Sequence, residues 1–190
     1  MENLDFVHSA PDPKTVSPRP TAIRYGLIWG GVGVLSTLIG FLTNTDPSLP
    51  STATGLKWAY GLIGFGVAIW CVFMAIKHHR DNELGGFLSL GRGMGMGTLV
   101  GLVAGAVTGV YMLLHTLVIN PGWADDMKAA MMEQYAEMGM AEEQAEQAIQ
   151  FASFAFNPAF MVVGGLINGV FLGFILGLII GAIMKRDAPK

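Results

Sequence analysis

Charge is the scarcest property of this sequence. Asp, Glu, Lys and Arg make up only 13% of the 190 residues, whereas a typical soluble domain has about 25%. Because the net charge is −3, the chain offers no basic excess for nucleic acid, and we exclude a nucleic-acid partner. The single cysteine, Cys71, excludes a disulfide framework within one chain. An ordinary water-soluble or disulfide-bonded domain is therefore not expected.

Motifs for catalysis are missing as well. The sequence contains neither G-x-x-x-x-G-K-[ST] nor G-x-G-x-x-G, which argues against nucleotide binding. No nucleophile–base pair and no metal-ligand set is visible. In the apolar segments, no Asp, Glu, Lys or Arg lies deeper than Arg24 and Lys57, which argues against a proton- or sodium-coupled pump. We expect a protein without enzymatic activity, catalytic residues, cofactor or metal.

Glycine is what the sequence has in excess, with 26 residues. Two glycine ladders repeat at every fourth position inside uncharged apolar segments: Gly93, Gly97, Gly101, Gly105 and Gly109, and Gly165, Gly169, Gly173, Gly177 and Gly181. In water, each helical glycine costs about 1 kcal/mol relative to alanine. In lipid the backbone must bond to itself, and small residues at this spacing let helices approach closely, as in a glycine zipper. The ladders predict helix packing inside a membrane.

Four apolar runs are long enough to cross a bilayer, at residues 21–42, 55–76, 94–118 and 158–184. We predict an all-α integral membrane fold with four transmembrane helices. Residues 1–20 hold four prolines and are interpreted as a flexible cytoplasmic tail, and residues 21–190 as a single membrane domain. The loop at 119–157 has helical periodicity interrupted by Gly139, which predicts an amphipathic helical hairpin between the third and fourth spans.

The orientation follows from the positive charges. Nine Lys and Arg residues flank one side of the spans and two, Lys57 and Lys128, lie on the other. Because positive loops stay in the cytoplasm, we expect both termini there, in a multi-pass protein of the bacterial inner membrane.

The small residues also predict helix contacts. Spans one and two carry small residues with a 3.5-residue period, which predicts an antiparallel hairpin with these residues at the contact: Gly26, Gly30, Gly33, Thr37 and Gly40 against Gly61, Gly64, Ala68, Cys71 and Ala75. Span four follows a strict four-residue repeat, which favours a right-handed crossing near about −40°. We expect spans three and four to pack through their ladders; the alternative is that one ladder meets its copy in an oligomer.

Two loops are candidates for binding. The 119–157 loop has seven carboxylates and one lysine, which indicates a solvated helical face or, alternatively, a cation or partner site. In the loop after span two, His78 and His79 indicate a basic span end near anionic lipid or, alternatively, a metal ligand. There we expect Gly85 and Gly86 to turn the chain, and Phe87, Leu88 and Leu90 to rest at the membrane interface.

Polar residues at membrane depth form the candidate site. Thr108, Tyr111 and His115 fall within about 60° of one another on a helical wheel. Asn168 lies near the middle of span four and could reach Thr108. These four residues indicate either interhelical hydrogen bonds or a polar pathway for an ion or small solute.

Four short segments resemble a bacterial four-helix membrane family of unknown function, the DUF4199 type: residues 24–28 (RYGLI), 85–93 (GGFLSLGRG), 119–121 (INP) and 139–146 (GMAEEQAE). Ala141 departs from the pattern, since such proteins tend to carry a capping serine there. The resemblance covers about residues 22–185 and implies four spans with an outer helical loop. It implies no activity and no catalytic residues.

The function that we expect is a scaffold or a subunit of a membrane complex. Its partners would be the lipid bilayer and a second copy or another membrane protein. The alternative is a small channel or transporter.

Overall fold

The structure is a computed structural model that describes residues 15–47, 49 and 52–186 of the chain. The part of the predicted tail at residues 1–14 lies outside the described residues. The fold is all-α, as predicted. Its elements are α1 (Arg19–Leu42), α2 (Thr54–His78), the π-helical turn η1 (His79–Glu83), α3 (Leu90–Leu114), the π-helical turn η2 (His115–Ile119), α4 (Trp123–Glu137), α5 (Glu142–Ala152), the short 3-10 helix η3 (Ser153–Phe156) and α6 (Pro158–Met184).

Four of the helical segments, α1, α2–η1, α3–η2 and α6, are long and apolar enough to cross a membrane. Capping explains where two of them begin. Ser89 accepts a hydrogen bond from the backbone N–H of Arg92, so α3 begins at Leu90, four residues before the predicted span. Asn157 caps α6 by accepting from the N–H of Ala159 at 2.9 Å, and Pro158 occupies the first turn.

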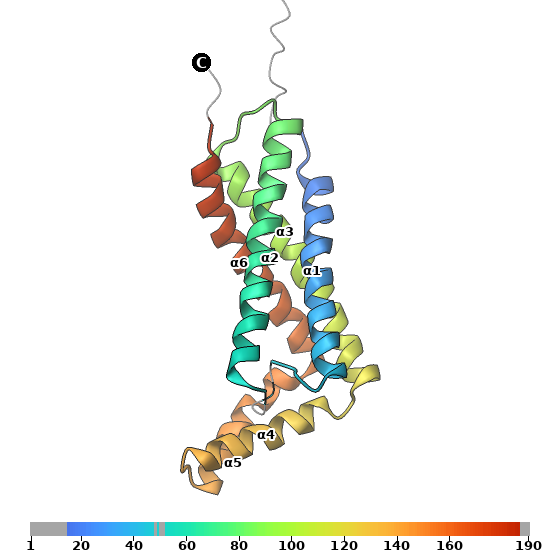
Figure 1. Cartoon of the computed structure of the whole chain (residues 1–190), viewed down its shortest axis with the longest axis vertical. Helices are drawn as coiled ribbons and strands as arrows, with labels where there is room; N and C mark the ends of the chain where they lie inside the picture. The colour runs from blue at the N-terminus through green and yellow to red at the C-terminus, as the bar shows by residue number, and fades with distance from the viewer. Residues whose placement is uncertain (1–14, 48, 50–51, 187–190) are drawn as a thin grey trace, which may run out of the picture.

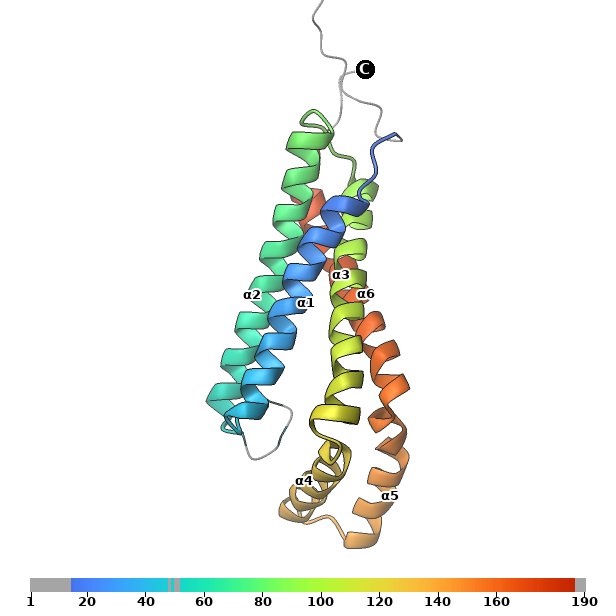
Figure 2. The ribbon, with the colours of Figure 1, turned by 90° about the vertical axis from the view of Figure 1, so that its right-hand side faces the viewer.

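The four long helices form an elongated bundle (Figure 1). The start of α1, η1 and the end of α6 lie at one end, which we call the η1 end. The α4–α5 hairpin lies at the opposite end, which we call the hairpin end. In Figure 2, α1 and α2 run together on one side, and α3 and α6 on the other.

The two glycine ladders face each other between α3 and α6. A Cβ placed on Gly97 would lie 2.6 Å from the Cα of Gly177, and one on Gly101 would overlap the carbonyl oxygen of Gly169. At the two ends of the ladders, Gly93 meets Gly181 and Gly109 meets Val162. Backbone therefore lies directly against backbone along this helix pair, and any larger side chain would force the two helices apart.

The predicted contact between the small residues of spans one and two is wrong, because the α1 glycines pack on a different helix. A Cβ on Gly26 would strike Val103, one on Gly30 would strike Val107, and Gly33 faces Thr108, so these α1 glycines pack on α3. On α2, Gly61 and Gly64 face open space, with nothing within 4 Å of an added Cβ. The periodicity identified a face that another helix can approach closely, but β-branched side chains of α3 occupy it instead of α2.

The core of the bundle is concentrated in its η1 half. Ala68, Cys71, Val72, Ala75 and Ile76 of α2 are all fully buried there. They belong to one apolar cluster with Met96, Val100 and the last two turns of α6. Leu88, expected at the membrane interface, is buried in this cluster, because its backbone pairs with Arg186 and draws the loop under the end of α6.

The α4–α5 hairpin extends the α3–α6 pair. Gly139 adopts φ +75°, and the N–H groups of Gly139 and Met140 bond to the carbonyls of Ala136 and Tyr135, which is a Schellman motif ending α4. The apolar side of α5, with Ala145 and Ile149 buried, packs on α4. The seven carboxylates of the hairpin are exposed, at Asp125, Asp126, Glu133, Glu137, Glu142, Glu143 and Glu146.

The ladder contact makes a first prediction about stability. Gly101→Leu should lower the free energy of unfolding by about 1–3 kcal/mol, because its side chain would collide with the α6 backbone. Gly95→Leu is the matched control on α3: Gly95 is exposed, and an added Cβ would meet nothing within 4 Å. Thermal unfolding in detergent should separate the two variants. Equal stability would show that the ladders are not in contact.

A second prediction separates the observed packing of α1 from the predicted seam. Gly30→Leu should destabilise the protein, because its side chain would strike Val107, whereas Gly64→Leu on α2 should be tolerated. If the two glycines instead met each other across an α1–α2 seam, both changes would be harmful to a similar degree. Chemical denaturation of the two variants in the same detergent distinguishes these outcomes.

Candidate functional site

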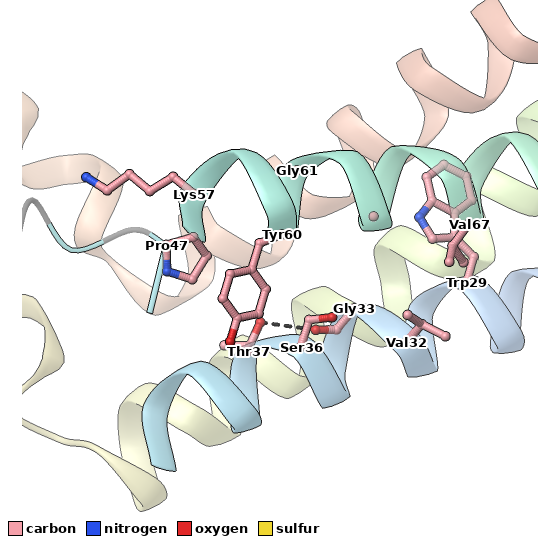
Figure 3. Close-up of a pocket in the computed structure, with 11 residues that line it drawn as sticks. Trp29, Val32, Gly33, Ser36, Thr37, Pro47, Lys57, Tyr60, Gly61 and Val67 are labelled. Atoms are coloured by element: carbon pink, nitrogen blue, oxygen red, sulfur yellow. Dashed lines mark hydrogen bonds between the residues drawn. The ribbon is translucent and has the colours of Figure 1, made fainter. Parts of the chain in front are cut away.

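A groove runs between α1 and α2 in the half of the bundle nearer the hairpin end. It encloses about 320 Å³. Its lining residues are Trp29, Val32, Gly33, Ser36, Thr37, Pro47, Lys57, Tyr60, Gly61, Gly64 and Val67. In Figure 3, Lys57 and Pro47 mark one end of the groove, Trp29 and Val67 mark the other, and Tyr60 reaches from α2 toward Thr37 of α1. We call this space the α1–α2 groove.

A second cavity of about 380 Å³ lies on the other side of α2, against α3 and α6. It shares Trp29, Tyr60, Gly61 and Gly64 with the α1–α2 groove and adds Thr108 and Asn168. The half of α2 nearer the hairpin end, which we call its outer half, is therefore flanked by space on both sides. This follows from its glycines, which have no side chain to fill the gap toward the neighbouring helices.

Both spaces are closed toward the η1 end. Ala68, Cys71 and Val72 follow the last groove residue of α2, and all three are fully buried. Met96 and Val100 of α3 close the same level, with no exposed surface. A solute entering from the hairpin end would meet this apolar packing, so the arrangement is a one-sided cleft.

Most hydroxyl groups in the cleft already have partners. Thr37 donates to the carbonyl of Gly33 at 3.1 Å, and Thr108 donates to that of Ala104 at 3.1 Å. The hydroxyls of Tyr60 and Thr45 lie 3.1 Å apart. Asn168 is exposed and makes no hydrogen bond to another of the described residues, and the side chain of Ser36 makes none either, so these two polar groups of the cleft are available to a ligand.

The four polar residues named from the sequence do not form one site. Thr108 and Asn168 line the same cavity, but Thr108 bonds within its own helix. Tyr111 and His115 form a separate pair, with the tyrosine hydroxyl 3.2 Å from Nδ1 of the histidine. His115 is fully buried, with its ring edge-on to Phe41 at 5.2 Å between centroids. The wheel arithmetic placed these residues on one face, but it could not show which neighbours would meet each of them.

A further cavity, of about 240 Å³, lies beside this pair at the hairpin end. Its polar lining consists of Asn44, Asp46, Asn120 and Asp126, and Trp123 contributes an aromatic wall. Asp46 is buried, and its backbone carbonyl accepts the hydroxyl of Thr52.

Sequence analysis missed the role of Glu83 at the η1 end. Its carboxylate accepts hydrogen bonds from the Thr21 hydroxyl and pairs with Nδ1 of the buried His79. Nε2 of His78 is 3.7 Å from the same carboxylate. The available signal was the four-residue spacing of His79 and Glu83, which places them on one helical face. Among the described residues, no group of three or more His, Cys, Asp or Glu is arranged to hold a metal ion.

The chain was also compared with known proteins. No curated protein and no solved structure matches it. One family does, the DUF4199 family, described as a protein of unknown function, and the match spans residues 24–186. That range takes in α1 from Arg24 onward, the other three long helices and the hairpin between the third and the fourth. The chain belongs to the DUF4199 family, as the resemblance of its short segments implied.

Proposed function

We propose that the protein is a non-enzymatic scaffold or subunit of a membrane complex, with the α4–α5 hairpin as its docking arm. The observation that carries the proposal is the way the hairpin is mounted. The π-helical turn η2 continues α3, and only residues 120–122 separate it from α4. On the return, η3 and Asn157 join α5 to α6. The hairpin is thus attached by two short links to the most tightly packed helix pair of the molecule.

The first residue of α4 is also held to the return link. The rings of Trp123 and Phe156 meet edge-on at 6.0 Å between centroids. Phe154 lies between Phe151 and Phe160 in a second chain of ring contacts, at 6.2 and 5.0 Å. A rigid arm that projects beyond the bundle (Figure 2) presents a defined surface to a partner, at a low entropic cost of ordering on binding.

The surface of the arm indicates the chemistry of its partner. All seven carboxylates are exposed, and Lys128 is bridged to Asp125 at 3.1 Å. Phe151 is 82% exposed and Met138 61% exposed, which adds apolar area beside the acidic face. This combination fits a partner with a basic surface around an apolar patch.

The positive charges support an orientation for the complex. Of the described Lys and Arg residues, seven lie on the side of the η1 end and two on the other, so the η1 end would face the cytoplasm. The hairpin would then project from the outer face of the bacterial inner membrane. A partner would be a second copy of the chain, another membrane protein or a protein outside the cytoplasm.

The docking-arm proposal predicts a loss of partners when the arm loses its charge. We expect the triple variant Glu142→Gln, Glu143→Gln, Glu146→Gln to lose at least tenfold of the co-purifying protein in a gentle-detergent pull-down from native membrane. Asp125→Asn is the control, because that carboxylate is already bridged to Lys128. The mass of the intact complex identifies the partner. If the complex is unchanged in the triple variant, the arm does not dock it.

A solute pathway is the second candidate, and Asn168 is the observation that favours it. This amide lines the second cavity with Thr108 and Tyr60 at membrane depth. Polar groups at that depth mark substrate routes in many transporters. The fully buried Cys71, Val72, Met96 and Val100 would have to separate for a solute to pass toward the η1 end.

The scaffold proposal predicts no solute-selective flux from liposomes that contain the purified protein. The physical reason is the apolar packing below the cleft, which offers no polar route. Ion and small-solute efflux measured with entrapped dyes tests this. Selective flux that Asn168→Leu abolishes would overturn the scaffold proposal in favour of a transporter.

A further inference from the structure

We propose that the α1–α2 groove binds one acyl chain of a phospholipid from the leaflet at the hairpin end, with the lipid phosphate beside Lys57. This inference is independent of the docking arm, since the groove lies within the membrane-spanning part of the chain. It assigns a ligand class to a space that neither the family nor the scaffold proposal explains.

The depth of the groove matches one leaflet. Along α2 the lining runs from Lys57 to Val67, ten steps of 1.5 Å and therefore about 15 Å. The hydrocarbon core of a bilayer is about 30 Å thick, so the groove ends near its middle. The buried Ala68, Cys71 and Val72 close it there. An acyl chain of one leaflet ends at that depth, whereas a partner's transmembrane helix would continue through both leaflets.

The chemistry of the lining changes along the groove as a phospholipid does. The deep end is formed by Trp29, Val32 and Val67, which are apolar or aromatic. The mouth carries Lys57 and the Tyr60–Thr45 hydroxyl pair. Trp58, next to Lys57 and 69% exposed, is of the residue type enriched at the membrane interface. A lysine at this level is placed to attract a phosphate, and the groove below it suits a hydrocarbon tail.

Two glycines leave the room that the tail would occupy. An added Cβ at Gly61 or Gly64 would meet nothing within 4 Å. The volume of about 320 Å³ is in the range of about 300–1,000 Å³ typical of small-molecule pockets. Because the groove lies at the depth of lipid tails, leaving it empty would forfeit the contacts of every side chain that lines it. A lipid tail can restore those contacts.

The test is lipid retention by the purified full-length protein. The protein is reconstituted in vesicles of phosphatidylethanolamine and phosphatidylglycerol, re-extracted in mild detergent, and weighed by native mass spectrometry. We expect one phospholipid to remain bound per chain. Gly64→Leu, which fills the groove, should reduce the lipid-bound fraction at least tenfold, and Lys57→Gln should reduce it several-fold.

Two variants serve as matched controls. Gly66→Leu adds the same side chain to the same helix at an exposed position outside the groove, and it should retain lipid as the unmodified protein does. Asn168→Leu changes only the cavity against α6, and it should also retain lipid. If Gly64→Leu does not fold, Gly61→Leu replaces it, with the thermal unfolding midpoint as the criterion of folding.

Three results would overturn the proposal. The first is equal lipid retention by Gly64→Leu and Gly66→Leu, which would mean that the lipid binds elsewhere. The second is a mass that corresponds to two chains and is lost in Gly64→Leu, which would assign the groove to a second copy. The third is no retained lipid in the unmodified protein. The pull-down result for the hairpin does not change any of these three lipid measurements. The docking-arm proposal and the lipid proposal can therefore be overturned independently.

Discussion

The contact between the backbones of α3 and α6 is the constraint on which the rest of this structure depends. Every fourth residue on both helices lacks a side chain, and the carbonyl of Gly169 lies where a Cβ on Gly101 would be. Lipid tails are as apolar as leucine, so apolar side chains alone give membrane helices little reason to associate. Close packing of backbone against backbone supplies that reason here. It is also intolerant of change, because the atoms in contact cannot rotate away as a flexible side chain would.

The position of the other two helices follows from this pair. The α1 glycines fit over Val103 and Val107, which stand on the face of α3 turned away from α6. By contrast, α2 is buried only in its η1 half, around Cys71 and Val72, and its outer half borders cavities on two sides. The molecule therefore combines a closely packed, closed half with an open one. A ligand or partner meets the least resistance in the open half, where glycine leaves space unfilled.

The hairpin and the Glu83 cluster terminate the bundle in different ways. At the hairpin end, short links and ring contacts such as Trp123–Phe156 fix the α4–α5 hairpin to the α3–α6 pair. At the η1 end, Glu83 joins Thr21 of α1 to His79 at the end of α2, so one carboxylate connects elements far apart in the chain. The carboxylate gives Nδ1 of the buried histidine a hydrogen-bond partner, while Nε2 of the same ring has none among the described residues.

The sequence by itself determined the composition-driven features: four apolar spans, the amphipathic hairpin, the helix stop at Gly139 and the faces along which backbones can approach. These depend on local periodicity and on the backbone's need for internal hydrogen bonds in lipid, which any single segment reveals. Only the tertiary structure decided which face meets which. Gly30 and Gly64 occupy equivalent positions in two similar patterns, yet one contacts Val107 and the other faces a cavity. For the same reason, the four polar residues of the candidate site lie in two places: Thr108 and Asn168 line one cavity, and Tyr111 and His115 form a separate pair. A small residue indicates that a neighbour can come close, but the neighbour is chosen by the shapes of all the helices packing at once.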